Sequence, residues 1–178
     1  MNLIFVRHGQ TYSNIKDICD DNPKIKTKLT KKGEMQAKKA AEILKNKKFD
    51  IIFTSEFFRT NETADIINQY HSVKIKVDKK LDDRKTGFTG KPEKEFIKFL
   101  KDSEDFWNAK HKNGESFEEE KKRLISFLKN LKNNKYDSIL IVTHGEPIQI
   151  IKGYFDNLNN KEMLNITINN CSIHEYKI

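Results

Sequence analysis

The sequence predicts an α/β fold in which a largely parallel sheet lies between two layers of helices. Short apolar runs alternate along the chain with longer segments whose apolar residues recur at helical spacing. The runs at residues 3–6 and 139–142 are unbroken and rich in branched residues, which is typical of strands covered on both faces. The 178 residues contain no internal repeat and no Pro-rich or Gly/Ser-rich linker. We therefore predict a single three-layer α/β/α domain over residues 1–178.

The first half of the chain contains two of the predicted strands and two helices. Residues 3–6 form the first strand, and an irregular polar stretch follows it. Thr30 can cap a helix whose apolar residues recur at helical spacing. These residues are Met35, Ala37, Ala40, Ala41 and Leu44. Residues 50–53 form the second strand, and Ser55 can cap the helix that carries Arg59, so Arg59 is expected near a strand's carboxyl end.

The second half adds an edge strand, three helices and two more strands. Residues 73–77 alternate apolar and polar side chains, as a half-exposed edge strand does. A loop with two glycines leads to a short helix with three apolar residues on one side, Phe96, Phe99 and Leu100. Residues 115–131 form an amphipathic helix. The strand at 139–142 leads into a helix with Pro147 in its first turn, and residues 170–178 form the last strand.

The composition argues against several classes of protein. The formal net charge is +8, but basic residues alternate with acidic ones on the predicted helices, so we expect no dedicated nucleic-acid binding. No apolar run is long enough for a signal peptide or a membrane span, and we expect no membrane association. Cys19 and Cys171 show neither metal-ligand spacing nor a disulfide framework, which favours a cytoplasmic location. The oligomeric state is not indicated.

Both unbroken apolar runs end in a histidine followed by a glycine. The first run is followed by Arg7, His8 and a glycine, and the later one by Thr143, His144 and Gly145. A histidine at one strand end is usually a structural residue. However, ligands of open α/β sheets bind beyond the carboxyl ends of parallel strands, where two neighbouring strands would bring both imidazoles to one crevice. The repeated pattern therefore predicts a ligand site.

The few arginines indicate an anionic ligand. Of the 34 basic residues, four are arginines and the other 30 are lysines. A chain that uses lysine almost everywhere is expected to keep arginine where a planar, bidentate donor is needed, as on a phosphate. Arg7, Arg59 and Arg84 lie in the segments already singled out, whereas Arg123 lies on a helix where a structural ion pair is expected.

These residue types suit the transfer of a phosphoryl group. Its transition state carries negative charge on three oxygens, which Arg7 and Arg59 can contact with paired donors. His144, if protonated, adds a third positive donor. A neutral His8 can present a lone pair to phosphorus while its other ring nitrogen donates to a backbone carbonyl. Because cationic side chains supply the positive charge, we expect neither a metal ion nor a cofactor.

An ordered series of motifs resembles the histidine phosphatase superfamily, also called the phosphoglycerate mutase-like family. The hallmark is Arg-His-Gly at residues 7–9. The other matching segments are LTKKGEMQA (29–37), SEFFRTNETA (55–64), GESFEE (114–119), VTHGEP (142–147) and NCSI (170–173). The likeness extends from Leu3 to about Tyr176. A lone Arg-His-Gly is weak evidence, but the ordered series is specific.

The resemblance implies a phosphoglycerate mutase-like fold, a small phosphorylated substrate and a phosphohistidine intermediate on His8 that water hydrolyses. It implies phosphate contacts from Arg7, Thr11, Asn14, Arg59, His144 and Gly145. It also implies a general acid, usually a glutamate two residues after a leucine at the end of the edge strand. Asp83 holds that place, with Asp82 as the alternative, and Arg84 is a candidate substrate contact. Residues 91–113 form an insertion that we expect to lie over the site.

We therefore predict a histidine acid-type phosphatase that hydrolyses phosphomonoesters, and two alternatives remain open. A cofactor-dependent phosphoglycerate mutase uses the same residues but returns the phosphoryl group to another hydroxyl. Mutases of this family generally carry longer insertions that close the site against water, and this chain has little room for them. The other alternative is a non-catalytic module that binds phosphorylated ligands, which would not need a nucleophile between its arginines.

Overall fold

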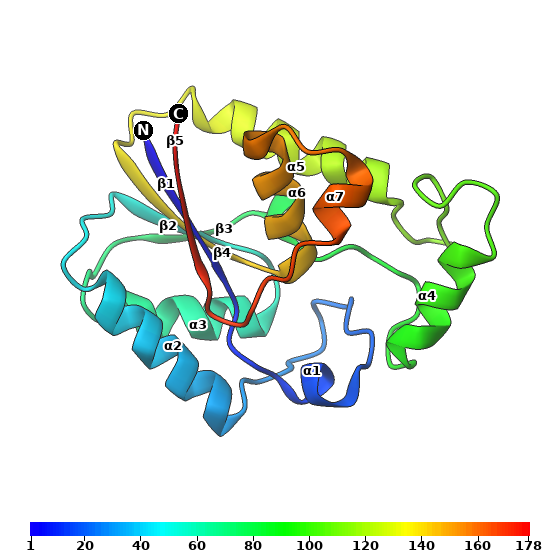
Figure 1. Cartoon of the computed structure of the whole chain (residues 1–178). Coiled ribbons are helices and arrows are strands. Elements are labelled where there is room, and N and C mark those ends of the chain that lie inside the picture. Colours follow the sequence, from blue (N-terminus) through cyan, green and yellow to red (C-terminus); the bar gives the residue numbers. More distant parts are fainter.

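The computed structural model describes residues 1–178 and consists of a five-stranded sheet with helices on both faces (Figure 1). The strand order is β3-β2-β4-β1-β5. The strands are β1 (Asn2–Arg7), β2 (Ile51–Thr54), β3 (Ile75–Val77), β4 (Ser138–Thr143) and β5 (Ile173–Lys177). Neighbouring strands are parallel except for β1 and β5, which are antiparallel. The predicted sandwich with a largely parallel sheet is therefore confirmed.

Two layers of helices cover the sheet. The helices are α1 (Tyr12–Lys16), α2 (Lys31–Leu44), α3 (Phe58–Asn68), α4 (Glu93–Lys101), α5 (Phe117–Leu131), α6 (Gly145–Asp156) and α7 (Asn160–Leu164), and a short 3-10 helix spans Lys79–Leu81. Helices α2 and α3 lie on one face, and α5 and α6 lie on the other (Figure 1). None of these helices has the length and apolar character needed to cross a bilayer.

The central strands are buried on both faces, as their unbroken apolar sequences predicted. On β1, Leu3 and Phe5 belong to the cluster that contains the apolar residues of α5 and α6. Ile4 and Val6 belong to the other cluster, with the apolar residues of α2 and α3. Successive side chains of a strand point to opposite faces, so a continuous apolar run can supply both cores at once. The rigid centre of the sheet therefore carries the two strand ends that bear the histidines.

The predicted first turn of α2 is confirmed, but one of its predicted core residues is not. Thr30 caps the helix, and its side-chain oxygen accepts a hydrogen bond from the Gly33 backbone N–H. Ala37 is fully buried, whereas Met35 is 63% exposed, so its assignment to the buried face is wrong. Two residues correspond to a rotation of about 200° around a helix. Met35 and Ala37 therefore cannot share a face.

Several other predicted boundaries differ from the structure; the last strand, for example, begins at Ile173 and not at residue 170. Ser55 does not cap α3, which begins at Phe58, because the Ser55 hydroxyl accepts from the Phe57 N–H and contacts His144. The edge strand begins at residue 75 and not at 73, because the Asn68 side chain bonds both backbone groups of Val73. Helix α5 begins at Phe117, two residues later than predicted. Its capping box is formed by Ser116 and Glu119.

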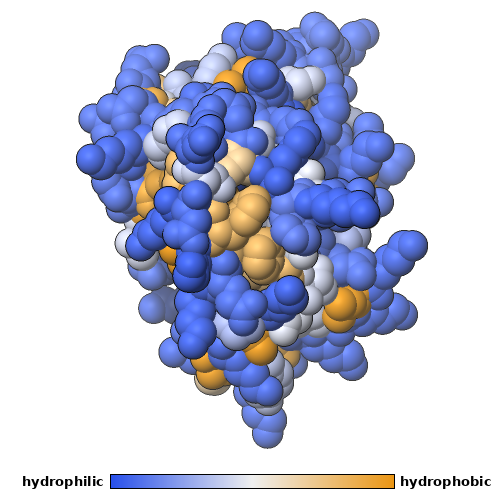
Figure 2. All heavy atoms as spheres, turned by 90° about the vertical axis from the view of Figure 1, so that its right-hand side faces the viewer, coloured by the Kyte–Doolittle hydropathy of each residue, from blue (hydrophilic) through white to orange (hydrophobic).

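The segment at residues 91–113 contains α4 and stands away from the sheet (Figure 1). Phe96 and Leu100 pack with Phe88 and Cys19 in a small cluster of their own. Figure 2 views the molecule from this side and shows apolar atoms at the centre of the face, surrounded by hydrophilic ones. That the segment acts as an insertion controlling the site remains a prediction.

Candidate active site

The two predicted histidines meet at the carboxyl ends of β1 and β4. These strands are parallel neighbours, and Arg7 on β1 pairs in register with Thr143 on β4. His8 and His144 each follow the last residue of a strand, so their rings lie with centroids 5.2 Å apart. The structure thus brings the two imidazoles together beyond neighbouring strand ends, as the repeated His-Gly pattern predicted, although only His8 lines the cavity.

His8 is held as a neutral imidazole whose unprotonated nitrogen accepts a hydrogen bond from Arg59. Its Nδ1 lies 2.8 Å from the Gly9 carbonyl oxygen, and Arg59 Nε donates to its Nε2 at 3.2 Å. Because Nε2 accepts a hydrogen bond, the ring proton is on Nδ1 and is donated to Gly9. Burial lowers the pKa of His8 well below its ordinary value, and the charges of Arg59 and Arg7 lower it further. Nε2 is therefore unprotonated at neutral pH, and its lone pair becomes available for attack when Arg59 Nε gives up this hydrogen bond.

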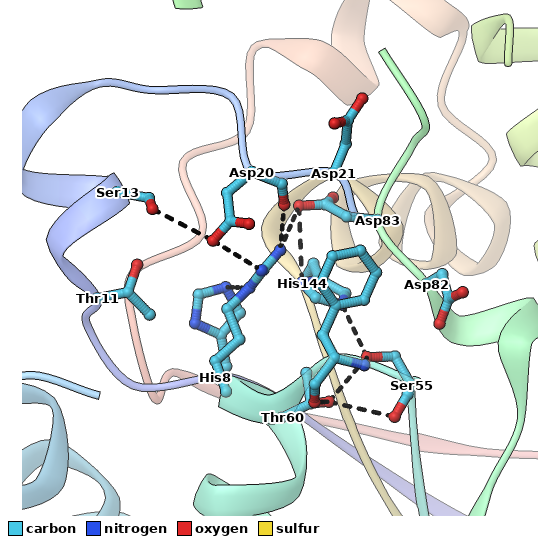
Figure 3. A network of polar contacts seen from close by, with 12 residues as sticks. His8, Thr11, Ser13, Asp20, Asp21, Ser55, Thr60, Asp82, Asp83 and His144 are labelled. Atoms are coloured by element: carbon cyan, nitrogen blue, oxygen red, sulfur yellow. Dashed lines mark hydrogen bonds and ion pairs between the residues drawn. The ribbon is translucent and has the colours of Figure 1, made fainter. Parts of the chain in front are cut away.

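Arg59 is the second element of the site and lies in the first turn of α3, close to the carboxyl end of β2. Its side chain is buried, and its donors are all directed at site residues. Nη1 lies 3.2 Å from Asp20 Oδ2, and Nη2 lies 3.4 Å from Asp83 Oδ2. Figure 3 shows these contacts converging between His8 and the aspartates. The guanidinium group thus links the nucleophile candidate to two carboxylates.

Arg7 offers donors that the protein leaves unused. Its Nη1 donates to the Ile168 carbonyl oxygen at 2.5 Å, but its Nε is buried without a hydrogen-bond partner. Gly145 lies against this guanidinium, and a Cβ atom at that position would be 3.4 Å from Nε. A buried cation with an unpaired donor is costly unless an anion completes it. Arg7 is therefore a candidate anion contact.

His144 is fully buried and connects the site to a chain of hydroxyl groups. Its Nε2 lies 2.9 Å from Ser55 Oγ, which lies 2.7 Å from Thr60 Oγ1 (Figure 3). Its Nδ1 has no hydrogen-bond partner and lies 3.6 Å from Asp83 Oδ2. Burial, together with Arg59, lowers the pKa of His144 well below its ordinary value. Without an anion in the site His144 is neutral, so it is not yet the third positive donor that was expected.

Only one of the two predicted acid candidates faces the site. Asp83 lines the cavity, and burial raises its pKa to about 6, with the charge of Glu146 raising it and that of Arg59 opposing the rise. Asp82 points elsewhere and accepts from the Glu56 backbone N–H at 2.8 Å (Figure 3). The geometry therefore favours Asp83, in agreement with its position after the leucine.

Arg84 is close to the site but is already paired. Its Nε lies 2.7 Å from Glu146 Oε1, and its Nη2 donates to Glu146 Oε2 at 2.9 Å. Its side chain is 5% exposed and lies over the Phe96 ring. Arg123 has the structural role that was expected, because it binds Glu115 through two nitrogens, at 2.8 and 2.7 Å. Arg123 is therefore not free to bind an anion without giving up a carboxylate, whereas Arg84 keeps Nη1 buried without a hydrogen-bond partner.

The first loop supplies small polar groups. Thr11 and Asn14 form the capping box of α1, and both line the cavity. The Thr11 oxygen accepts from the Asn14 N–H, which leaves the Thr11 hydroxyl proton and the Asn14 side-chain amide as donors. Asp20 and Glu146 were not predicted as site residues, because their partners Arg59 and Arg84 are far away in the chain. The only signal was the position of Glu146 within the VTHGEP segment.

Most of the residues predicted for the site border a cavity of about 450 Å³, which is large enough for a small phosphorylated molecule, but the buried His144 is not among its lining residues. Its polar floor contains Arg7, His8, Arg59 and Asp83. The apolar part of its lining comes from the first loop, α4, the end of α7 and the segment that follows α7. The apolar lining residues are Ile18, Cys19, Phe96, Leu164, Ile166 and Ile168.

Comparisons with known proteins agree with this arrangement. Residues 3–178 match the family model described as the histidine phosphatase superfamily (branch 1). The uncharacterized phosphatase PhoE of Bacillus subtilis is 32% identical over 182 residues, which cover 98% of this chain and 90% of that protein. The 2,3-bisphosphoglycerate-dependent phosphoglycerate mutase of Methanococcus vannielii is 29% identical over 204 residues, covering 94% and 86%. The crystal structure of the alpha-ribazole phosphatase from Shigella flexneri matches this fold with a TM-score of 0.87 at 21% identity, covering 100% of this chain and 91% of that one.

Proposed function

Because the chain belongs to the histidine phosphatase superfamily, we propose that it is a phosphomonoesterase that acts through a phosphohistidine on His8. The observation that carries the proposal is the state of His8. Its Nδ1 proton is held by the Gly9 carbonyl, and its Nε2 lone pair lies beside the guanidinium group of Arg59. A nucleophile in this position serves turnover, whereas a module that only binds phosphate has no use for it.

In the first step the Nε2 lone pair of His8 attacks phosphorus and forms the P–N bond. The bond between phosphorus and the ester oxygen breaks, and its electron pair stays on the departing alcohol. Asp83 donates the proton that this oxygen needs, since its pKa of about 6 keeps part of the population protonated near neutral pH. The alcohol then leaves, and Asp83 remains as a carboxylate.

The phosphoryl oxygens are bound by groups that have donors to spare. Arg7 contributes guanidinium donors that no protein group engages, and Arg59 turns its Nη atoms from the carboxylates toward the phosphate. Thr11 and Asn14 contribute the hydroxyl and amide donors of the first loop. The negative charge of the substrate raises the pKa of His144, which then becomes the third positive donor. These groups stabilise the charge that spreads over the oxygens in the transition state.

In the second step water replaces His8. The Asp83 carboxylate accepts a proton from the water, whose oxygen attacks phosphorus, and the P–N bond breaks with its electron pair returning to His8. Inorganic phosphate leaves, and Asp83 is protonated again. In this scheme the positive side chains stabilise the charge, so the chemistry needs no divalent metal. The small phosphorylated substrate, the metal-independent mechanism and the cytoplasmic location all remain predictions.

The proposal is tested with a panel of phosphomonoesters assayed for released phosphate, with and without 2,3-bisphosphoglycerate. We expect phosphate release without that additive, and we expect it to exceed phosphoryl transfer to 2- or 3-phosphoglycerate. The opposite ratio would assign the chain to the mutases. The His8→Ala variant is the control, because a contaminating phosphatase would survive the substitution.

A further inference from the structure

The candidate active site contains many acidic residues for a site that binds a phosphate dianion. None of the 30 lysines lines the cavity, and its cations are Arg7, Arg59 and Arg84. Five carboxylates line it as well, from Asp20, Asp21, Asp83, Glu93 and Glu146. Arg84 is bound to Glu146, so only two of the cations are directed at the place for the phosphate. The carboxylates that line the cavity therefore outnumber the arginines, and a bound substrate has to tolerate this negative charge.

Asp20 is the carboxylate with the most direct influence on the phosphate. Its Oδ2 lies 3.2 Å from Arg59 Nη1 and accepts from the Ser13 hydroxyl at 3.2 Å (Figure 3). The side chain is only 10% exposed. Its other oxygen, Oδ1, accepts no hydrogen bond and is not enclosed by protein, so it is open to the cavity. The Asp20 carboxylate thus contacts Arg59 Nη1, the nitrogen with which a bound phosphate would pair.

Binding of a phosphate exchanges one anion for another at Arg59. When a phosphoryl oxygen takes Nη1, Asp20 loses its cation but stays nine-tenths buried beside a new dianion. A buried charge without a partner is strongly unfavourable, and two adjacent anions make it worse. A substrate that carries its own positive charge near the ester would pair with Asp20 and remove this penalty.

We propose that Asp20 selects phosphomonoesters whose leaving alcohol carries an ammonium group close to the ester oxygen. A phosphoryl oxygen about 2.9 Å from Arg59 Nη1 lies within about 6 Å of Asp20 Oδ2, given the present contact of 3.2 Å. An ammonium group three bonds from the ester oxygen reaches about 4 Å from it at about 1.5 Å a bond, and a charged hydrogen bond of about 2.8 Å covers the remaining distance to Asp20. This inference rests on the proposed function and adds the chemical class of its substrate.

The first test compares substrates that differ only in charge. O-Phosphoethanolamine and propyl phosphate have nearly the same shape, but only the first is cationic at pH 7, and 2-phosphoglycolate carries a carboxylate instead. We expect kcat/KM of the wild type to be about 10- to 100-fold higher for phosphoethanolamine than for propyl phosphate. This factor corresponds to the usual contribution of one charged hydrogen bond to the binding free energy. We expect 2-phosphoglycolate to be the poorest of the three.

The second test uses Asp20→Asn, with Asp17→Asn as its matched control. Asp17 is exposed in the same loop, and its left-handed backbone conformation (φ 49°) accepts asparagine, so the control removes one charge without touching Arg59. Asp20→Asn should bring the ratio of the two esters close to 1 and improve the hydrolysis of propyl phosphate. Asp17→Asn should keep the wild-type ratio.

The outcomes separate the two proposals. Equal or better hydrolysis of propyl phosphate by the wild type, or an unchanged ratio in folded Asp20→Asn, overturns the assignment of Asp20 and leaves a phosphatase. If Asp20→Asn does not fold, as judged by circular dichroism, the wild-type ratio alone decides. A wild type that hydrolyses none of these esters and no p-nitrophenyl phosphate overturns the proposed function together with this inference.

Discussion

If Asp83 is the general acid, the loss of activity on replacing it should depend on the leaving group of the substrate. An acid matters most when the departing oxygen is strongly basic and little when it is a stable phenolate. Asp83→Asn removes the proton but keeps the size of the side chain. We expect it to slow an alkyl phosphate by about 10²- to 10⁴-fold, the usual contribution of a general acid, and p-nitrophenyl phosphate far less. Single-turnover rates are needed, since Asp83 also activates water and its loss slows the second step.

The pKa of Asp83 predicts the pH dependence of the same reaction. With a pKa of about 6, the carboxyl group is about 90% protonated at pH 5 and about 9% protonated at pH 7. The acid is the protonated form, so kcat/KM for an alkyl phosphate should fall about tenfold per pH unit above pH 6. The phosphate monoester itself ionises near pH 6. The ratio of wild type to Asp83→Asn at each pH removes that contribution and should retain the fall.

Asp82→Asn is the matched control for both experiments. Asp82 is the neighbouring aspartate, but its carboxylate accepts from the Glu56 backbone and does not face the cavity. Its substitution should affect the two esters equally and mildly. The reasoning is refuted if Asp82→Asn shows the selective loss, or if Asp83→Asn slows both esters to the same extent in the first step.

Three further predictions follow from other contacts. Glu146→Gln removes a charge that raises the pKa of Asp83, so the fall in kcat/KM for the alkyl phosphate should begin at a lower pH; a fall that begins at the same pH would contradict this role. Gly33→Ala should lower the free energy of unfolding by about 1–3 kcal/mol in urea denaturation, because a Cβ would overlap the Gln10 carbonyl oxygen, whereas exposed Lys32→Ala should have little effect. Activity should survive EDTA and be inhibited by vanadate, a mimic of the transition state; loss in EDTA with recovery on adding a divalent metal would count against the metal-free chemistry.

The raised pKa of Asp83 also has a consequence for stability. A carboxyl group whose pKa is higher in the folded than in the unfolded protein binds more protons when folded, between its ordinary pKa and about 6. Its contribution to the free energy of unfolding therefore decreases as the pH rises through that range. The raised pKa that suits Asp83 to act as an acid therefore lowers the stability of the folded protein at neutral pH, a trade-off that is common at active sites.

The position of the catalytic candidates could be predicted from the sequence because it depends on local patterns. An apolar run marks a buried strand, and a parallel sheet collects the residues that follow such strands at one edge. His8, His144 and Arg59 were placed correctly for this reason. The prediction needed only the order of the elements and not the details of side-chain packing.

Other features could not be read from local patterns because they depend on partners far away in the chain. Ser55 has the residue type of a helix cap, but its hydroxyl is directed at His144, 89 residues later. Asp20 resembles any polar loop residue until the fold brings it to Arg59. Met35 followed the apolar spacing only approximately, and the spacing did not show which side of α2 would meet the sheet. Hydrogen bonds and ion pairs across the fold decided the first two cases, and the packing of α2 against the sheet decided the third.

The central claim is tested most directly by trapping the phosphoryl group on His8. Asp83→Asn should still transfer phosphate from p-nitrophenyl phosphate, whose leaving group needs little help, but it should release the phosphate slowly. After rapid quenching we expect close to one acid-labile, alkali-stable phosphate per chain, carried by the peptide that contains His8, together with a burst of p-nitrophenol. Phosphate on another residue, or hydrolysis without any burst or bound phosphate, would contradict the account.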